Sequence, residues 1–170
     1  MTENDLILLA KEVVEKLKKS NTTIAVAESC TGGWLSKILT EISGVSAIYQ
    51  GGICSYSNNV KMKILGVREE TLKAYGAVSS QTAEEMAKGV RKALESDLGI
   101  GITGIAGPLS DNTQKPVGLI YVSLADGNKT TTIELKNTFT DNVRLQNRLS
   151  AVETALHLLG GINEEKKANE

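Results

Sequence analysis

The sequence predicts an α/β fold: a three-layer α/β/α arrangement with a mixed, mostly parallel sheet of about five strands. Segments with helical periodicity alternate with short β-branched or apolar segments through the first two thirds of the chain, a pattern typical of parallel strands covered by helices. The dipeptide Asp126-Gly127 then separates two strand-like segments, which indicates an antiparallel hairpin. Because no repeat or linker divides the 170 residues, we expect one domain over residues 1–162.

Each element follows from a local pattern. Apolar residues recur at helical spacing in five segments, expected as helices: 6–17, 35–42, 60–75, 83–94 and 145–159. Five shorter segments are rich in β-branched or apolar residues and are expected as strands: 22–27, 48–56, 98–103, 118–125 and 129–135. Glycines mark the boundaries: Gly32-Gly33 follow the first strand, Gly66 divides the third helical segment into two short helices, and Gly160-Gly161 are expected to end the last helix.

Composition and charge exclude several classes of function. Nineteen Lys and Arg against twenty Asp and Glu leave a formal charge of −1, which provides no positive field for nonspecific binding to nucleic acid or to anionic membranes. No apolar run reaches the ~20 residues of a membrane span, and the amino terminus has acidic residues ahead of its apolar part, unlike a signal peptide. We therefore expect a cytoplasmic protein. Cys30 and Cys54 lack the spacing of a metal site and are expected as buried free thiols. The polar residues 163–170 are expected to form a disordered tail.

Three polar segments follow predicted strands, where ligands gather in sheets of this type. They are 27–33 (AESCTGG), 56–61 (YSNNVK) and 103–108 (TGIAGP), the last of which opens a long loop over 104–116. In the first segment a strand stops and a helix begins. Free N–H groups and the positive helix end would therefore face an anion or a developing oxyanion.

Ser29 lies on this strand-to-helix turn, where a serine is either a nucleophile or a helix-capping hydroxyl. A nucleophilic serine needs a base, and the single histidine, His157, lies in the last turn of a predicted helix, off its apolar face. This position disfavours a Ser-His-Asp triad and leaves Lys61 or Tyr56 to take the proton. The sequence leaves open whether Lys61 is a base with a lowered pKa or a solvated helix residue, and whether Tyr56 is a half-buried strand aromatic.

A glycine motif and a pair of arginines could each mark a binding site, but each also has a purely structural explanation. Residues 99–104 match GxGxxG, but they lie within a strand and run into a loop, so we reject a dinucleotide site. Arg144 and Arg148 are four residues apart near the start of the last helix. They form either a clamp for a phosphate or carboxylate, or a solvated basic face.

Six motifs become specific in combination: AESCTGG (27–33), YSNNVK (56–61), GAVS (76–79), MAKGVR (86–91), TGIAGP (103–108) and KPVG (115–118). In this order and spacing, over roughly residues 5–160, they resemble the CinA carboxy-terminal domain family. The resemblance implies a three-layer α/β/α amidase domain that hydrolyses the carboxamide of nicotinamide mononucleotide to the nicotinate form and ammonia. It also implies a homodimer without metal or cofactor. The amino-terminal domain of full-length CinA proteins is absent from this sequence, which is similar to the single-domain deamidases.

By motif position the resemblance implies that Ser29 is the nucleophile, Lys61 its base and Tyr56 the neighbouring tyrosine. Cys30, beside the nucleophile, is expected to be a spectator. Backbone N–H groups around Thr31-Gly32-Gly33 or at Gly104 are expected to hold the oxyanion, and Arg144 and Arg148 to hold the 5′-phosphate. The residues expected to bind substrate are Thr31, Gly32, Gly33, Thr103, Gly104, Arg144 and Arg148.

Two departures from the family pattern keep other functions open. Residues 109–113 (LSDNT) replace an acidic residue or glycine followed by Gly-Gly, and Asn142-Val143-Arg144 replaces Gly-Asp-Arg; asparagine tolerates the left-handed backbone conformation. The altered loop motivates an amidase for a related nucleotide amide as one alternative. The other alternative is a nucleotide-binding or competence-associated module without turnover.

Overall fold

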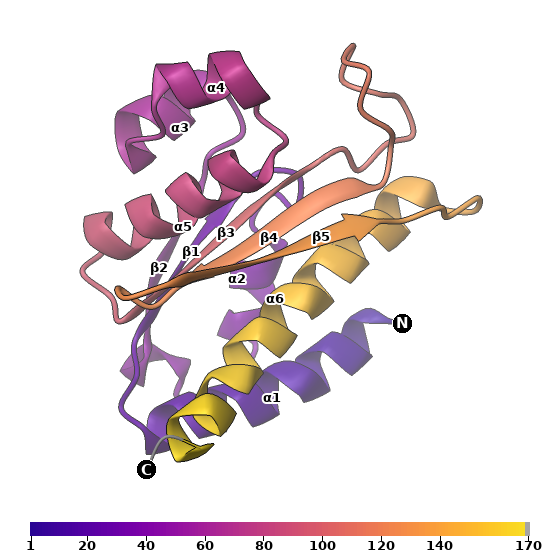
Figure 1. The fold of residues 1–170 in the computed structure, drawn as a ribbon. Helices are drawn as coiled ribbons and strands as arrows, with labels where there is room; N and C mark the ends of the chain where they lie inside the picture. Colours follow the sequence, from indigo (N-terminus) through magenta and orange to yellow (C-terminus); the bar gives the residue numbers. More distant parts are fainter. Residues whose placement is uncertain (169–170) are drawn as a thin grey trace.

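The sheet of the protein has five strands in the order β2-β1-β3-β4-β5. The computed structural model describes residues 1–168, with side chains up to Gly161 (Figure 1). Its strands are β1 (Ile24–Glu28), β2 (Tyr49–Cys54), β3 (Leu98–Gly104), β4 (Leu119–Ala125) and β5 (Thr130–Lys136). Strand β1 pairs in parallel with β2 and β3, whereas β4 runs antiparallel to both β3 and β5. The predicted mixed sheet, with all described strands but β4 running in one direction, is therefore confirmed.

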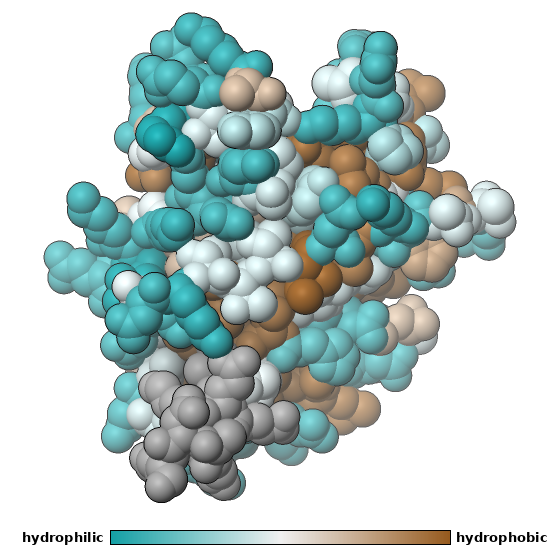
Figure 2. All heavy atoms as spheres, in the orientation of Figure 1, coloured by the Kyte–Doolittle hydropathy of each residue, from teal (hydrophilic) through white to brown (hydrophobic). Residues whose placement is uncertain are grey.

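Helices cover both faces of this sheet, as predicted. They are α1 (Glu3–Lys19), α2 (Trp34–Thr40), α3 (Asn58–Leu65), α4 (Glu69–Tyr75), α5 (Ser80–Ala93) and α6 (Val143–Ala168), with a 3-10 turn at Val45–Ala47. Helices α1, α2 and α6 lie on one face, and α3, α4 and α5 lie on the other (Figure 1). In the same view, apolar side chains gather in a band between the two helical layers, beside the β5 edge of the sheet (Figure 2).

The two helical layers enclose cores of different size. The larger core joins the buried faces of α1, α2 and α6 to the sheet, and the smaller one joins α3 and α5 to Ala25 and Ala27 of β1. Burial of each large aliphatic side chain contributes roughly 1.5–3 kcal/mol, so the larger core supplies most of the stabilisation. The site at the end of β1 lies between these two packed layers.

Glycines in β3 allow α5 to pack directly on the sheet. A Cβ atom at Gly99 would lie 2.1 Å from the carbonyl oxygen of Ala87, and one at Gly101 would lie 2.3 Å from that of Ala83. These distances are too short for any side chain, so the glycines are required by helix packing. The GxGxxG pattern at residues 99–104 is therefore explained by the packing of α5 on β3, in agreement with the rejection of a dinucleotide site.

The structure differs from the sequence expectations near the carboxyl terminus and at one cysteine. Helix α6 continues to Ala168, so Gly160-Gly161 do not end it. Of the expected disordered tail, residues 163–168 belong to α6, and residues 169–170 lie outside the described residues. Cys54 is exposed, not buried, because alternate residues of β2 face solvent. Asn142, just before α6, has a φ of 46°, the left-handed conformation that asparagine tolerates.

Candidate active site

The carboxyl ends of the three parallel strands meet at one edge of the sheet. Glu28 at the end of β1 is paired with Cys54 of β2 on one side and with Ile102 of β3 on the other. The residues that follow, Ser29 and Ser55, are therefore brought close to the end of β3. This is the edge where the sequence placed the site.

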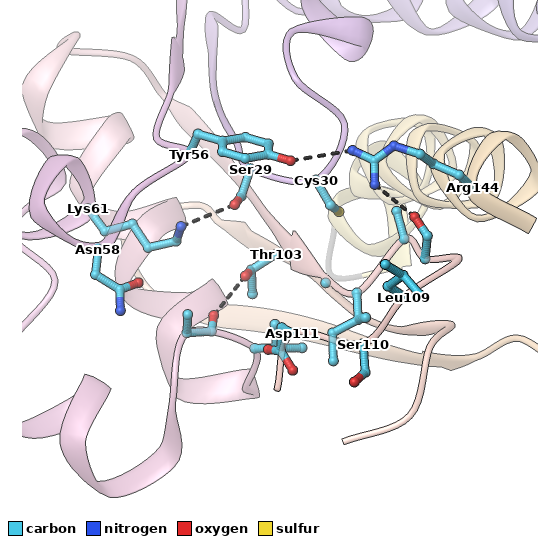
Figure 3. A pocket seen from close by; sticks show the side chains of 16 residues that line it. Ser29, Cys30, Tyr56, Asn58, Lys61, Thr103, Leu109, Ser110, Asp111 and Arg144 are labelled. Carbon is cyan, nitrogen blue, oxygen red and sulfur yellow. Dashed lines mark hydrogen bonds between the residues drawn. The ribbon is translucent and has the colours of Figure 1, made fainter. Parts of the chain in front are cut away.

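At this edge the side chain of Lys61 meets that of Ser29 (Figure 3). Ser29 comes directly after β1 and is 9% exposed, and Lys61 lies on α3 and is 1% exposed. The Nζ atom of Lys61 lies 3.1 Å from the Oγ atom of Ser29, within hydrogen-bond distance. The two side chains that the sequence proposed as nucleophile and base are thus in direct contact.

Burial makes Lys61 a plausible base. Its amine also donates a hydrogen bond to the backbone carbonyl of Ser55, at 2.7 Å. Desolvation disfavours the ammonium form and lowers the pKa of Lys61 from 10.5 to about 8, against a small opposing influence of Cys30. Lys63, two residues further along α3, is exposed to solvent. The sequence left open that Lys61 is a solvated helix residue of this kind, but Lys61 is buried.

The turn that holds Ser29 is fixed by a buried carboxylate. Gly32 and Gly33 have φ angles of 60° and 90°, a left-handed conformation that favours glycine. The side chain of Glu28, fully buried, accepts hydrogen bonds from the N–H groups of Gly33 (3.1 Å), Leu35 (3.0 Å) and Ser36 (2.9 Å). These are donors that the first turn of a helix would otherwise leave unpaired.

This arrangement changes the expected oxyanion donors. The N–H group of Gly33 is bound to Glu28, and that of Gly32 donates to the carbonyl of Ser29 at 3.1 Å. Both groups are among the predicted oxyanion donors, and the positive end of α2 was predicted to face an anion. The structure contradicts this expectation because the chain supplies its own carboxylate to the helix end.

A pocket of about 240 Å³ opens in front of Ser29 and Lys61 (Figure 3). Other lining residues include Tyr56, Asn58, Thr103, Gly104, Arg144 and the loop residues 109–111. Thr103 and Gly104, two of the residues expected to bind substrate, thus line the pocket. The hydroxyl of Thr103 donates to the carbonyl of Ala77 at 2.7 Å, which ties the end of β3 to the segment before α5.

Tyr56 lies at the mouth of the pocket. It is 66% exposed, and its hydroxyl accepts a hydrogen bond from Arg144 at 3.3 Å. Among residues 1–168 its hydroxyl has no hydrogen bond to Ser29 or Lys61. The geometry therefore favours Lys61 over Tyr56 as the base, and the tyrosine is placed to contact a bound molecule.

The two arginines of α6 have different surroundings. Arg144 lines the pocket and donates to the carbonyl of Gly107 at 2.9 Å. Arg148 instead donates to the carbonyl of Thr31 at 2.7 Å and stacks on the Trp34 ring, 4.8 Å from its centroid. Arg148 and Thr31 are absent from the pocket lining, so the expected two-arginine clamp is reduced to Arg144.

Cys30 and His157 do not form a nucleophile–base pair. Cys30 lines the pocket, but burial raises the pKa of its thiol to about 12, which keeps it protonated. His157 is exposed on α6, where its Nε2 atom lies 3.7 Å from Glu153. Among the described residues no group of three or more His, Cys, Asp and Glu side chains could hold a metal ion, and no described helix is long and apolar enough to span a membrane.

Two residues of the site were not identified from the sequence. Glu28 is part of the AESCTGG segment, but a glutamate six residues ahead of the first residue of a helix is not an ordinary capping residue, so the sequence did not indicate its role. Ser55 contributes through its backbone carbonyl, which no side-chain pattern indicates. An acidic residue at the end of an otherwise apolar strand was the available signal for Glu28.

Comparison with known proteins gives a family match over most of the chain. Residues 7–162 match the sequence profile described as the CinA C-terminal domain. A CinA-like protein of Syntrophomonas wolfei is 47% identical over 157 residues, 92% of this chain and 36% of that protein. A CinA-like protein of Nostoc punctiforme is 55% identical over 117 residues, 69% of this chain and 28% of that protein. The chain thus spans about a third of the length of these curated relatives.

Solved structures have the same fold over nearly the whole chain. The competence/damage inducible protein CihA from Agrobacterium tumefaciens superposes with a TM-score of 0.87 at 38% identity, covering 94% of this chain and 96% of that one. A CinA superfamily protein from Klebsiella pneumoniae also gives 0.87, at 29% identity, covering 97% of this chain and 99% of that one. The chain therefore belongs to the CinA C-terminal domain family.

Proposed function

We propose that the protein is an amidohydrolase that converts nicotinamide mononucleotide to nicotinate mononucleotide and ammonia, with Ser29 as nucleophile and Lys61 as base. The observation that carries the proposal is the 3.1 Å contact between the Lys61 amine and the Ser29 hydroxyl inside a pocket. The choice of substrate rests on the family resemblance of the motifs that build this site.

The first half of the reaction acylates Ser29. A neutral amine has two N–H groups and one lone pair, and the carbonyl of Ser55 accepts one N–H of Lys61. The lone pair is then available to take the proton of Ser29 as its oxygen attacks the carboxamide carbon. When the tetrahedral intermediate collapses, Lys61 returns that proton to the amide nitrogen, the C–N bond breaks, and ammonia leaves.

The second half hydrolyses the resulting ester. Water attacks the acyl carbon while Lys61 accepts one of its protons, and the proton then passes to the Ser29 oxygen as the ester bond breaks. The products are nicotinate mononucleotide and the free serine. Lys61 is neutral at the start and the end of the cycle, so its lowered pKa suits both steps.

The oxyanion of both intermediates needs donors other than those of Gly32 and Gly33. The N–H groups of Cys30 and Thr31 have no hydrogen-bond acceptor on another residue within 1–168. In serine hydrolases the N–H of the residue after the nucleophile commonly contributes to the oxyanion hole. We therefore assign the oxyanion to this part of the turn, beginning with Cys30. Such donors are worth a few kcal/mol each.

Arg144 and Tyr56, on the open side of the pocket, would bind the substrate. Arg144 uses one N–H for Gly107 and another for Tyr56, and a guanidinium has five. The remaining donors would hold the 5′-phosphate while Tyr56 contacts the nucleotide.

The loop residues 109–111 line the same side and depart from the family pattern. This observation favours a related nucleotide amide as the second candidate substrate.

The experiment is an assay of the purified chain for ammonia and nicotinate mononucleotide released from nicotinamide mononucleotide. We expect turnover by the wild type and none above background by folded S29A or K61A. A folded wild type that binds the nucleotide without turnover would contradict the proposed activity. A panel of other amides then separates the second candidate substrate from a binding module.

A further inference from the structure

We propose that Glu28 is a positioning residue for the nucleophile. Its buried carboxylate fixes the Ser29–Gly33 turn so that the Ser29 hydroxyl meets Lys61. The inference rests on the proposed function, because it concerns the activation of the same serine. Glu28 does not touch the reacting atoms, and it acts through the turn that follows it.

The Glu28 carboxylate joins the end of β1 to the first turn of α2. Glu28 is the last residue of β1, so its backbone is held by the neighbouring strands β2 and β3. One side-chain oxygen accepts from the N–H groups of Gly33 and Leu35, and the other accepts from the N–H and hydroxyl of Ser36, at 2.9 and 2.8 Å. Glu28 therefore holds both ends of the turn, the first through its backbone in β1 and the second through its side chain on α2.

The backbone of the same residue supports the base. The N–H of Ser55 donates to the carbonyl of Glu28 at 2.8 Å, and the carbonyl of Ser55 in turn accepts from the Lys61 amine at 2.7 Å. Lys61 then reaches Ser29 at 3.1 Å. Nucleophile and base are therefore both positioned from Glu28, one through its side chain and the other through its main chain.

The left-handed glycines explain why such a clamp is needed. Gly32 and Gly33 provide the sharp turn between β1 and α2, and glycine is the most flexible residue in an unfolded or loosened chain. Without the carboxylate, the turn would lose the bonds that oppose this flexibility, and three N–H groups would compete for other acceptors. A misplacement of about 1 Å at a reacting group costs on the order of 100-fold in rate.

The test measures the reactivity of Ser29 directly, with a fluorophosphonate probe whose adduct is located by mass spectrometry. The variant E28Q keeps the size of the side chain but replaces one acceptor oxygen by an NH₂ group. We expect its labelling rate and kcat to fall on the order of 100-fold per folded molecule, with KM changed less than about threefold. S36A removes one of the four hydrogen bonds to Glu28 and is expected to give a smaller loss of the same kind.

Controls separate positioning from general destabilisation. T2A removes the cap of α1, far from the pocket, and is expected to leave the labelling rate of the folded protein unchanged. If folded E28Q has the labelling rate and kcat of the wild type, the positioning role is overturned. If E28Q does not fold, unchanged labelling rate and kcat in S36A overturn it instead. A wild type that neither labels at Ser29 nor releases ammonia would overturn the proposed function itself, and the positioning role with it.

Discussion

The two walls of the pocket are built differently. On one wall, Ser29 and Lys61 are at most 9% exposed and are joined by a hydrogen bond, and Glu28 is buried behind them at the end of β1. On the other wall, Tyr56 is 66% exposed and Leu109 is 84% exposed. The buried wall is held by hydrogen bonds to Lys61, whereas the open wall consists of Tyr56, the loop residues 109–111 and Arg144 in the first turn of α6 (Figure 3). We infer that the reaction chemistry lies on the first wall and substrate choice on the second.

The difference also separates the motif segments from the loop that the sequence predicts to depart from the family pattern. The altered residues 109–113 fall on the open wall, where a substitution meets solvent and leaves the packed core unchanged. Ser29 of the AESCTGG segment and Lys61 at the end of YSNNVK form the buried wall, where a substitution would break a hydrogen bond or leave a cavity. Substitutions on the two walls should therefore have effects of different kind and size.

The largest effect is expected at the buried wall. K61M should lower kcat by about 10²–10⁴-fold, because the variant lacks the general base. K63M alters an exposed lysine on the same helix and should keep wild-type kinetics, so steady-state assays of both variants decide the point. A K61M protein that retains more than a tenth of the wild-type kcat would show that another group takes the serine proton.

K61M should also be at least as stable as the wild type at neutral pH. Because the pKa of Lys61 is lowered to about 8, the unfolded chain binds more protons than the folded chain up to pH ~10.5. The free energy of unfolding of the wild type, measured relative to that of K61M, should therefore rise by up to about 3 kcal/mol as the pH increases from 8 towards 10.5. Denaturant titrations at both pH values measure this gain, and a loss would contradict the lowered pKa.

On the open wall, R144Q should act mainly on binding. Removing a charged hydrogen-bond donor to a phosphate costs about 1.5–3 kcal/mol, which corresponds to roughly a 10- to 100-fold rise in KM for the nucleotide. The kcat should change much less. Nicotinamide riboside, which lacks the phosphate, is the matched substrate control. An equal loss on riboside and nucleotide would show that Arg144 does not contact the phosphate.

R148Q tests the other arginine of the same helix. Its contacts with the Thr31 carbonyl and the Trp34 ring are structural, so the variant should lower the free energy of unfolding by about 1–3 kcal/mol. KM for the nucleotide should stay within about threefold. A rise in KM as large as that of R144Q would restore the two-arginine clamp that the sequence suggested.

The smallest effect is expected at Leu109. The L109A variant removes an exposed side chain from the loop, and its unfolding free energy should stay within about 0.5 kcal/mol of the wild type. Any kinetic change should be confined to substrate preference within a panel of nucleotide amides. A stability loss well above 1 kcal/mol in thermal or denaturant unfolding would mean that the open wall is packed after all.

Much of this arrangement could be predicted from the sequence, and the limits have physical causes. The helical and strand periodicities predicted the layers and the order of the elements. The lack of a suitable histidine left Lys61 or Tyr56 as the base, and the family resemblance favoured Lys61. Periodicity reports which face of a helix is buried, but it does not report a contact between distant side chains. The stacking of Arg148 on Trp34 and the clamp of Glu28 on α2 depend on such contacts, and only the folded chain reveals them.

The most direct test of the Ser29–Lys61 pair is the pH dependence of fluorophosphonate labelling at Ser29. Because only neutral Lys61 can take the serine proton, the labelling rate should rise about tenfold between pH 7 and pH 9, with a midpoint near 8. K61M should show a low rate without this midpoint. Labelling at another residue, or a wild-type rate that does not depend on pH over this range, would contradict the assignment of Ser29 as nucleophile and Lys61 as its base.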